Sequence, residues 1–262
     1  MEPKIKQAVI VFFDLEMIPN MVEAMKVWPQ LSNYPGLTLR ATVSTIICAG
    51  WKYYGHKKVE CINAWDWPKK WKNNINNDFE VVKAIYDVLK HADAVVTHNG
   101  KRFDWKFLQT RLMYHGLGPL GNIHHIDTKQ TASRHLYSFN NRLGYLGEWL
   151  ANDKKLDHEG WDLWVDVSND CEKAKKKMTA YCKQDVLLLE KVFERLKPLI
   201  SNIPNYNIFI PGRHHKCPNC GSIKVSNNGW RHTKTRSYKR YICRDCKTWF
   251  RTDAKDNMPR PL

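Results

Sequence analysis

Long apolar runs are absent from this sequence of 262 residues. The apolar run at residues 8–13 is too short for a signal peptide or a membrane span, and polar residues precede it. Internal repeats and low-complexity tracts are also missing, which excludes a repeat array, while a hydrophobic content of 43% suffices for a core. We therefore expect a soluble, cytoplasmic protein that has no membrane partner.

Acidic residues are scarce. Asp and Glu number 26 against 42 Lys and Arg, which gives a formal net charge of +16 at pH 7. The imbalance is strongest in residues 201–262, where 13 basic and 3 acidic residues give +10. Such a charge indicates a polyanionic partner, and nucleic acid is the obvious candidate. Its concentration in the last quarter of the chain indicates that this quarter has a task of its own.

The eight cysteines fall into two groups. Four are scattered through apolar patterns, and we expect them to be buried thiols in a reducing compartment: Cys48, Cys61, Cys171 and Cys182. The others form two C-x-x-C pairs separated by 22 residues: Cys217 with Cys220, and Cys243 with Cys246. This spacing predicts one closed, tetrahedral Zn²⁺ site of the ribbon type. Disulfides are the alternative, which the lack of a secretory signal disfavours.

Strand and helix patterns alternate over the first 200 residues. After an irregular segment at 17–40, they predict a hairpin (42–54 and 58–65) and strands at 92–98 and 123–127. They also predict helices at 78–91, 103–115, 128–136, 142–150 and 171–196. Residues 168–170 are expected to cap the last of these helices. This order predicts an α/β domain with a mixed sheet flanked by helices. The Trp- and Lys-rich segment 65–72 is either a base-stacking surface or a loop packed against the sheet, and we favour the loop.

Two carboxylates end the first apolar run. Asp14 and Glu16 stand one residue apart, after a segment whose β-branched and aromatic residues predict a buried central strand. Side chains at i and i+2 of a strand share a face, so the two carboxylates point in the same direction. Hard divalent cations such as Mg²⁺ prefer such oxygen ligands. A strand that merely ends at solvent would explain the same pair.

Further residues fit the same chemistry. Asp185 lies on the apolar stripe of the last helix, where a carboxylate is costly unless it is paired or binds metal. Tyr181 lies on the same helix face, one turn earlier. Asp104 begins a helix after an Asn-Gly turn, a position that the helix dipole alone would also favour. Asn99, in that turn, is a candidate contact for a nucleic-acid substrate.

These residues read Asp-x-Glu, Asn-Gly-x-x-x-Asp and Tyr-x-x-x-Asp in chain order. Over roughly residues 7–197 the chain resembles the DEDD superfamily of 3′→5′ exonucleases, on the ribonuclease-H-like fold. Within it the chain is similar to the tyrosine-bearing (DEDDy) branch and to proofreading exonuclease domains. Residues 126–128, 143–146 and 161–164 carry the same resemblance. The histidine branch would need His in place of Ala180, and Met17 departs from the family's usual Thr or Ser.

The resemblance implies a mechanism with two Mg²⁺ or Mn²⁺ ions. Asp14, Glu16 and Asp185 would hold one ion, and Asp14 would bridge to a second ion supported by Asp104. Two ions about 4 Å apart activate a water and stabilise the leaving 3′ oxygen. Tyr181 would orient that water, because a phenol with an ordinary pKa near 10 is a poor base at neutral pH. The implied activity is release of nucleoside 5′-monophosphates from a 3′ end of DNA, or of RNA, with a single strand as the expected partner.

Cations and aromatic residues alternate around the C-terminal cysteines. They are candidate contacts for phosphates and bases, respectively: Arg231, Lys234, Arg236, Lys239, Arg240, Lys247 and Arg251, with Trp230, Tyr238 and Trp249. The segment resembles the zinc ribbons of transposases and transcription proteins. A protein-binding ribbon whose Trp249 or Phe250 fills a small core is the alternative, and the net charge favours nucleic acid.

We therefore divide the chain into a DEDDy-like exonuclease domain (1–200), a linker (201–211), a small basic zinc-ribbon domain with four cysteine ligands (212–252) and a tail (253–262). Two other functions stay open. A transposase or integrase would need three carboxylates but no inward Tyr-x-x-x-Asp helix. A non-catalytic nucleic-acid-binding protein would not need the four carboxylates that the chain has. The oligomeric state is left open.

Overall fold

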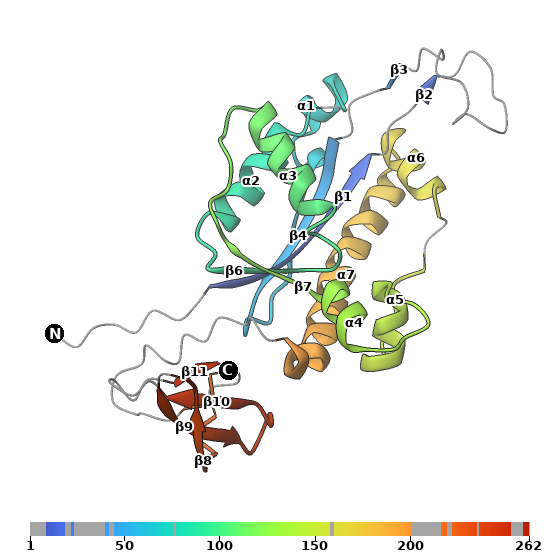
Figure 1. The fold of residues 1–262 in the computed structure, drawn as a ribbon. Helices are drawn as coiled ribbons and strands as arrows, with labels where there is room; N and C mark the ends of the chain where they lie inside the picture. Colours follow the sequence, from blue (N-terminus) through green and yellow to red (C-terminus); the bar gives the residue numbers. More distant parts are fainter. Residues whose placement is uncertain are drawn as a thin grey trace, which may run out of the picture.

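The computed structural model describes most of the chain, namely residues 9–18, 22–23, 40–41, 45–75, 77–157, 160–200, 216–218, 222–234, 236–252 and 259–261. Within these residues a mixed α/β unit is followed by a small antiparallel sheet near the C-terminus (Figure 1). Among the described helices, none combines the length and apolar character that a membrane crossing needs.

A five-stranded sheet forms the centre of the first unit, with the strand order β5-β4-β1-β6-β7. Its members are β1 (Ile10–Ile18), β4 (Thr45–Tyr53), β5 (Glu60–Asn63), β6 (Ala94–Thr97) and β7 (His124–Asp127). The central strand β1 pairs antiparallel with β4 and parallel with β6. The sheet is therefore mixed, and the predicted fold class is confirmed.

Side chains of β1 alternate between two apolar cores. Phe13 belongs to one core, which α2 (Phe79–Leu89) and α3 (Asp104–Tyr114) cover. Phe12 belongs to the other core, which contains the second half of α7 (Glu172–Leu196). Three shorter helices pack against α7: α4 (Thr128–His135), α5 (Leu143–Leu146) and α6 (Asp162–Ser168). Figure 1 shows α7 running along the sheet, on the side away from α2 and α3.

The predicted loop at 65–72 is wrong, because this segment is mostly helical. It forms the short 3₁₀-helix η2 (Ala64–Asp66) and then α1 (Pro68–Asn73). Proline suits the first position of a helix, where a backbone N–H has no helical partner to lose. Trp71 is buried in the core and its neighbouring tryptophans pack against that core. The packing role that we favoured for the tryptophans is therefore confirmed.

The start of α7 also differs from the expectation. Cys171 is its N-cap, without a side-chain capping hydrogen bond, and this cysteine is exposed rather than buried. Asp170 has a φ of +64° and accepts a hydrogen bond of 2.8 Å from Trp71 Nε1, while it also pairs with Lys175. Instead of capping α7 in the usual way, Asp170 joins the start of α7 to α1.

The predicted helix at 142–150 is shorter and less regular. Four residues form α5, and a π-helical turn, η3 (Gly147–Ala151), follows. A Cβ on Gly147 would lie 2.6 Å from Leu188 Cδ1, so this turn lies hard against α7. The strands of the predicted hairpin are also shorter than expected. Of the segment at 17–40, the structure describes the end of β1, β2 (Val22–Glu23) and the first residue of β3 (Arg40–Ala41); the rest lies outside the described residues.

A four-stranded antiparallel sheet, called here the C-terminal sheet, has the order β11-β10-β9-β8. Its strands are β8 (Val225–His232), β9 (Ser237–Cys243), β10 (Trp249–Thr252) and β11 (Pro259–Pro261). Because β11 pairs with β10, the sheet extends into the residues that we had assigned to a tail. The predicted linker at 201–211 lies outside the described residues.

Candidate metal centre and nucleic-acid interface

Three carboxylates from distant parts of the chain converge beside the second half of β1. Asp14, Glu16 and Asp185 each place one oxygen within 4.8 Å of the others. Asp14 and Glu16 follow Phe12 at intervals of two residues, so the alternation of the strand directs them to the α7 side of the sheet. Asp185 is buried on the inward face of α7. The structure thus brings together three of the four carboxylates that the sequence selects.

Burial and mutual repulsion make this cluster favourable for a cation. Burial, followed by repulsion from Glu16 and Asp185, raises the pKa of Asp14 well above its usual range. Burial likewise raises the pKa of Glu16 to about 8, with Asp185 as the next cause. A divalent cation between the carboxylates would offset both effects. The donor set, which offers only oxygen atoms in a confined space, fits Mg²⁺ or Mn²⁺.

Asp104, the fourth carboxylate, lies at the margin of this cluster. It stands in the first turn of α3 and is largely buried, and burial raises its pKa to about 6. Its carboxylate accepts a hydrogen bond from the backbone N–H of Leu15, the residue between the two acids of β1. The charge of Asp104 also contributes to the raised pKa values of Asp14 and Glu16. Asp104 therefore lies within electrostatic range of the cluster, and its part in metal binding stays a prediction.

Tyr181 and Lys155 line the α7 side of the cluster. Lys155 Nζ donates a hydrogen bond of 3.0 Å to the Tyr181 hydroxyl and also pairs with Asp185. Burial, followed by the charge of Asp185, raises the pKa of Tyr181 to about 12, so the phenol keeps its proton at neutral pH. Burial opposes the charge on Lys155, yet Asp185 and Tyr181 raise its pKa above the ordinary value. The sequence gives no signal for Lys155, which follows Lys154 in an irregular segment.

The turn between β6 and α3 sets the position of Asp104. Asn99 has a φ of +67°, and a Cβ on Gly100 would lie 2.3 Å from Thr97 Oγ1, so only glycine fits there. The Asp127 carboxylate accepts the N–H of Asn99 at 3.0 Å and also caps α4. Sequence reasoning missed this role of Asp127. A contact between Asn99 and nucleic acid stays a prediction.

The comparison with protein families matches this part of the chain. A family model described as the RNase H superfamily matches residues 41–197, which is more than half of the chain. The chain belongs to the RNase H superfamily. Strand β1, with Asp14 and Glu16, precedes the matched segment and extends the RNase H domain on its N-terminal side. Membership supports a nuclease in general, with a nucleic acid as its substrate and divalent metal ions as its usual cofactors.

Solved structures provide a second comparison for the RNase H domain. The chain is similar to the family B DNA polymerase from the hyperthermophilic archaeon Pyrobaculum calidifontis, with a TM-score of 0.52 and 15% sequence identity. The match covers 78% of this chain but only 26% of the polymerase, so the chain spans about a quarter of that protein. At this identity the similarity shows the fold alone. No curated protein matches the chain.

Three of the four candidate zinc ligands lie together after the RNase H domain. Cys217, Cys243 and Cys246 each place a sulfur within 4.8 Å of the others, and the sulfurs of Cys217 and Cys246 are 3.5 Å apart. The N–H of Lys247, a residue with a φ of +60°, donates a hydrogen bond of 3.0 Å to the Cys243 carbonyl. This bond closes the turn that contains Cys243 and Cys246. Cys220 lies outside the described residues. The donor set fits Zn²⁺, which four thiolates bind in tetrahedral sites.

One face of the C-terminal sheet combines cations with aromatic rings. Arg240 lies over the ring of Trp249 at 4.6 Å, and Arg251 lies over the ring of Tyr238 at 4.4 Å. Arg240 pairs with Arg251 in the ladder, and Arg231 pairs with Tyr238, so these residues share a face. Guanidinium groups stacked on aromatic rings suit both phosphates and bases.

The remaining candidate contacts are solvent-exposed: Lys234, Arg236, Lys239 and Lys247. Phe250 is fully buried and stacks on Tyr241 at 5.5 Å, whereas Trp249 is 38% exposed. Phe250 therefore fills the small core, whereas Trp249 lies on the basic face beside Arg240. The binding role of these cations stays a prediction.

Proposed function

We propose that this protein is a metal-dependent 3′→5′ exonuclease of the DEDDy type that hydrolyses phosphodiester bonds of DNA or RNA. The observation that carries the proposal is the convergence of Asp14, Glu16 and Asp185, with Tyr181 one helical turn from Asp185. Membership in the RNase H superfamily supports a nuclease, and the similar fold of a DNA polymerase is compatible with a domain that acts on a DNA end.

Each residue has a distinct task in this proposal. When bound, two Mg²⁺ or Mn²⁺ ions supply an activated water and stabilise the negative charge of the leaving 3′ oxygen. Asp14, Glu16 and Asp185 would hold these ions, and Asp104 would support the second one. The protonated Tyr181 donates a hydrogen bond that orients the water, and Lys155 fixes the position of the phenol. No side chain has to form a covalent bond to the substrate.

The surroundings of the cluster suit a single strand. Phe103 precedes Asp104 and is 59% exposed, so its ring is available for stacking with an unpaired base. We propose that the C-terminal sheet, organised by one Zn²⁺ ion, contributes further contacts through its basic face. The binding of the strand by two surfaces would keep its 3′ end near the carboxylates.

Degradation of labelled oligonucleotides tests this proposal. Single- and double-stranded DNA and RNA with a 5′ label, some with a blocked 3′ end, are incubated with the protein and Mg²⁺ or Mn²⁺. We expect stepwise shortening that requires a free 3′ end and releases nucleoside 5′-monophosphates. Asp14→Asn and Asp185→Asn should lower the rate by at least about 10³-fold, because each removes a ligand charge from the metal site.

Asp166→Asn provides the matched control, because Asp166 is an exposed carboxylate on α6. Its activity should equal that of the unmodified protein. Cleavage within the strand, equal cleavage of blocked ends or joining of one strand to another would contradict the exonuclease and favour an endonuclease or a transposase. Binding without any cleavage would favour a non-catalytic nucleic-acid-binding protein.

A further inference from the structure

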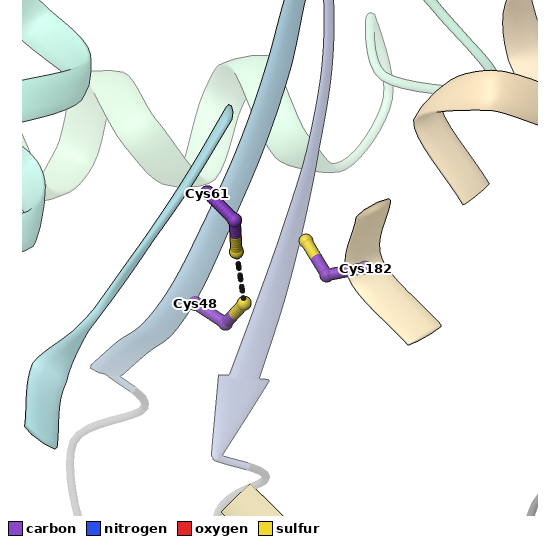
Figure 2. A group of neighbouring side chains, drawn as sticks. All are labelled: Cys48, Cys61 and Cys182. Atoms are coloured by element: carbon purple, nitrogen blue, oxygen red, sulfur yellow. Dashed lines mark hydrogen bonds between the residues drawn. The ribbon is translucent and has the colours of Figure 1, made fainter. Parts of the chain in front are cut away.

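Three cysteines that the proposed nuclease chemistry does not use lie together beside the carboxylates. Cys48 comes from β4, Cys61 from β5 and Cys182 from α7, and each places its sulfur within 4.8 Å of the others. Figure 2 shows the three side chains pointing toward one another from two strands and a helix. They are therefore not scattered thiols, as the sequence suggests, but a cluster.

The cluster is enclosed, with one side near solvent. Cys48 and Cys182 are fully buried, whereas Cys61 is only partly buried and offers a route of entry. Gly50 creates the space for the helix cysteine, since a Cβ there would lie 2.9 Å from Cys182 Sγ. Asn63 Oδ1 lies 3.5 Å from Cys61 Sγ and provides an oxygen beside the three sulfurs. A site for a small ion needs such a set of convergent donors.

A disulfide is the first alternative, because the sulfurs of Cys48 and Cys61 are only 3.1 Å apart. In the ladder, however, Cys48 pairs with Asn63 and Cys61 pairs with Gly50, so the two cysteines are diagonal neighbours. Diagonal positions in an antiparallel sheet are about 7–8 Å apart, beyond the range of about 4.4–6.8 Å between the Cα atoms of a disulfide. The backbone register therefore disfavours a disulfide between them.

Apolar packing is the second alternative, since buried cysteine often behaves as a small hydrophobic residue. Packing alone gives no reason for three sulfurs, from three separate elements, to meet at one point. Around a tetrahedral Zn²⁺ ion, sulfurs at about 2.3 Å from the metal lie about 3.8 Å from one another. The three sulfurs of the cluster already lie within 4.8 Å of one another, so small side-chain rotations suffice to reach this arrangement.

We propose that Cys48, Cys61 and Cys182 form a binding site for one thiophilic d¹⁰ cation of the Zn²⁺ type. The thiols bind as thiolates and release their protons to solvent, and Asn63 or a water completes the coordination. Cys61 is the thiol that such a cation meets first, because it is only partly buried whereas Cys48 and Cys182 are fully buried.

The bound ion would tie the sheet to α7 directly beside the carboxylates. Cys48 pairs with Glu16 in the ladder, and Cys182 Sγ lies 3.9 Å from the carbonyl oxygen of Asp14. The cation would therefore join three elements whose relative position sets the distances in the carboxylate cluster. This inference does not depend on the proposed exonuclease activity, because metal content can be measured without any substrate.

Zinc content of the full-length protein tests the site. The protein is equilibrated with Zn²⁺ and desalted, and zinc per chain is then measured by elemental analysis. We expect Cys61→Ser to lose one equivalent relative to the unmodified protein, since serine keeps the size of the side chain but not its affinity for zinc. Cys171→Ser, which changes the exposed cysteine at the start of α7, should lose none. Equal zinc content in Cys61→Ser and Cys171→Ser would overturn the proposal.

A protection experiment on the unmodified protein keeps the test independent of variant folding. Iodoacetamide labelling is followed by peptide mass spectrometry, with and without added Zn²⁺. Zinc should slow the labelling of Cys61 at least about tenfold and leave that of Cys171 unchanged. Equal labelling of Cys61 in both conditions, or a Cys48–Cys61 disulfide in the protein as purified, would overturn the proposal.

Discussion

At Gly50, α7 approaches the sheet closely. A Cβ there would lie 2.9 Å from Cys182 Sγ, 3.2 Å from the Cys182 carbonyl oxygen and 3.2 Å from Val186 Cγ2. Because part of this contact is helix backbone, which cannot rotate away, Gly50→Ala should lower the free energy of unfolding by about 1–3 kcal/mol. Urea denaturation measures the change, and Gly121→Ala, with no atom within 4 Å of its Cβ, is the control. Equal stability of the two variants would show that α7 shifts freely.

Lys155 gives a second prediction at the scale of single residues. Its ammonium contacts both Asp185 and the Tyr181 hydroxyl, and a hydrogen bond to a charged group is worth about 1.5–3 kcal/mol. We expect Lys155→Met to lower kcat about 10–100-fold with little change in KM. The same variant should reach half-maximal activity at a lower Mg²⁺ concentration, because a positive charge beside the metal ligands is gone.

Lys154→Met is the matched control, since it removes an exposed lysine from the neighbouring position. Its kcat and its Mg²⁺ dependence should match those of the unmodified protein. If Lys155→Met lowers kcat but leaves the Mg²⁺ dependence unchanged, the ammonium acts on the structure of the site and not on its charge.

At the scale of elements, α7 shows what the sequence predicts well. Its apolar residues recur at helical spacing over 25 residues, so the inward position of Tyr181 and Asp185 follows from the pattern alone. The helical segment α1 was missed because its six residues are mostly Lys and Trp and have no apolar period. Short elements such as this one owe their conformation to tertiary packing, here the burial of Trp71.

In the candidate site, too, some residues can be predicted from the sequence and others depend on tertiary packing. Asp14 and Glu16 lie on β1 directly after its apolar run, and Asp104 begins α3, so the sequence selects them. Lys155 lies in a segment without regular structure, and only the packing of that segment against α7 brings it to Tyr181. The cluster of Cys48, Cys61 and Cys182 depends on strand register and on the approach of α7, which no spacing rule expresses.

Asp78 joins three elements and gives a prediction at this scale. It accepts hydrogen bonds from Arg111 Nε on α3 at 2.8 Å and from the backbone N–H of Ile46 on β4 at 2.9 Å, just before α2 begins. Asp78 and Arg111 form an ion pair, and both side chains are almost completely buried. Asp78→Ala should therefore lower the free energy of unfolding by about 3–5 kcal/mol, because it leaves a buried guanidinium without its partner. Urea denaturation measures this change.

An exposed carboxylate provides the comparison for Asp78. Asp87 pairs with Lys83 and Lys90 on the surface of α2, where ion pairs contribute about 0–1 kcal/mol. Asp87→Ala should therefore change the stability by less than about 1 kcal/mol. A similar loss in both variants would mean that the buried pair does not hold α2, α3 and β4 together.

At the scale of the whole molecule, positive charge is concentrated away from the RNase H domain. Residues 201–262 carry +10 of the total of +16. In the C-terminal sheet, Arg240 and Arg251 are neighbours in the ladder and each stacks on an aromatic ring. If this face binds a single strand, each phosphate contact adds about 0.7 to the slope of log affinity against log salt concentration.

The double variant Arg240→Ala/Arg251→Ala should therefore weaken binding and reduce the magnitude of this slope by about 1.4. Fluorescence anisotropy with a labelled single-stranded oligonucleotide measures both quantities, in an Asp14→Asn background without added Mg²⁺ so that the strand stays intact. Lys83→Ala/Lys90→Ala removes the same charge from the surface of α2 and should leave the slope unchanged. An equal slope change in the two double variants would mean that net charge alone attracts the strand. A slope that neither variant changes would contradict a role of Arg240 and Arg251 in binding the strand.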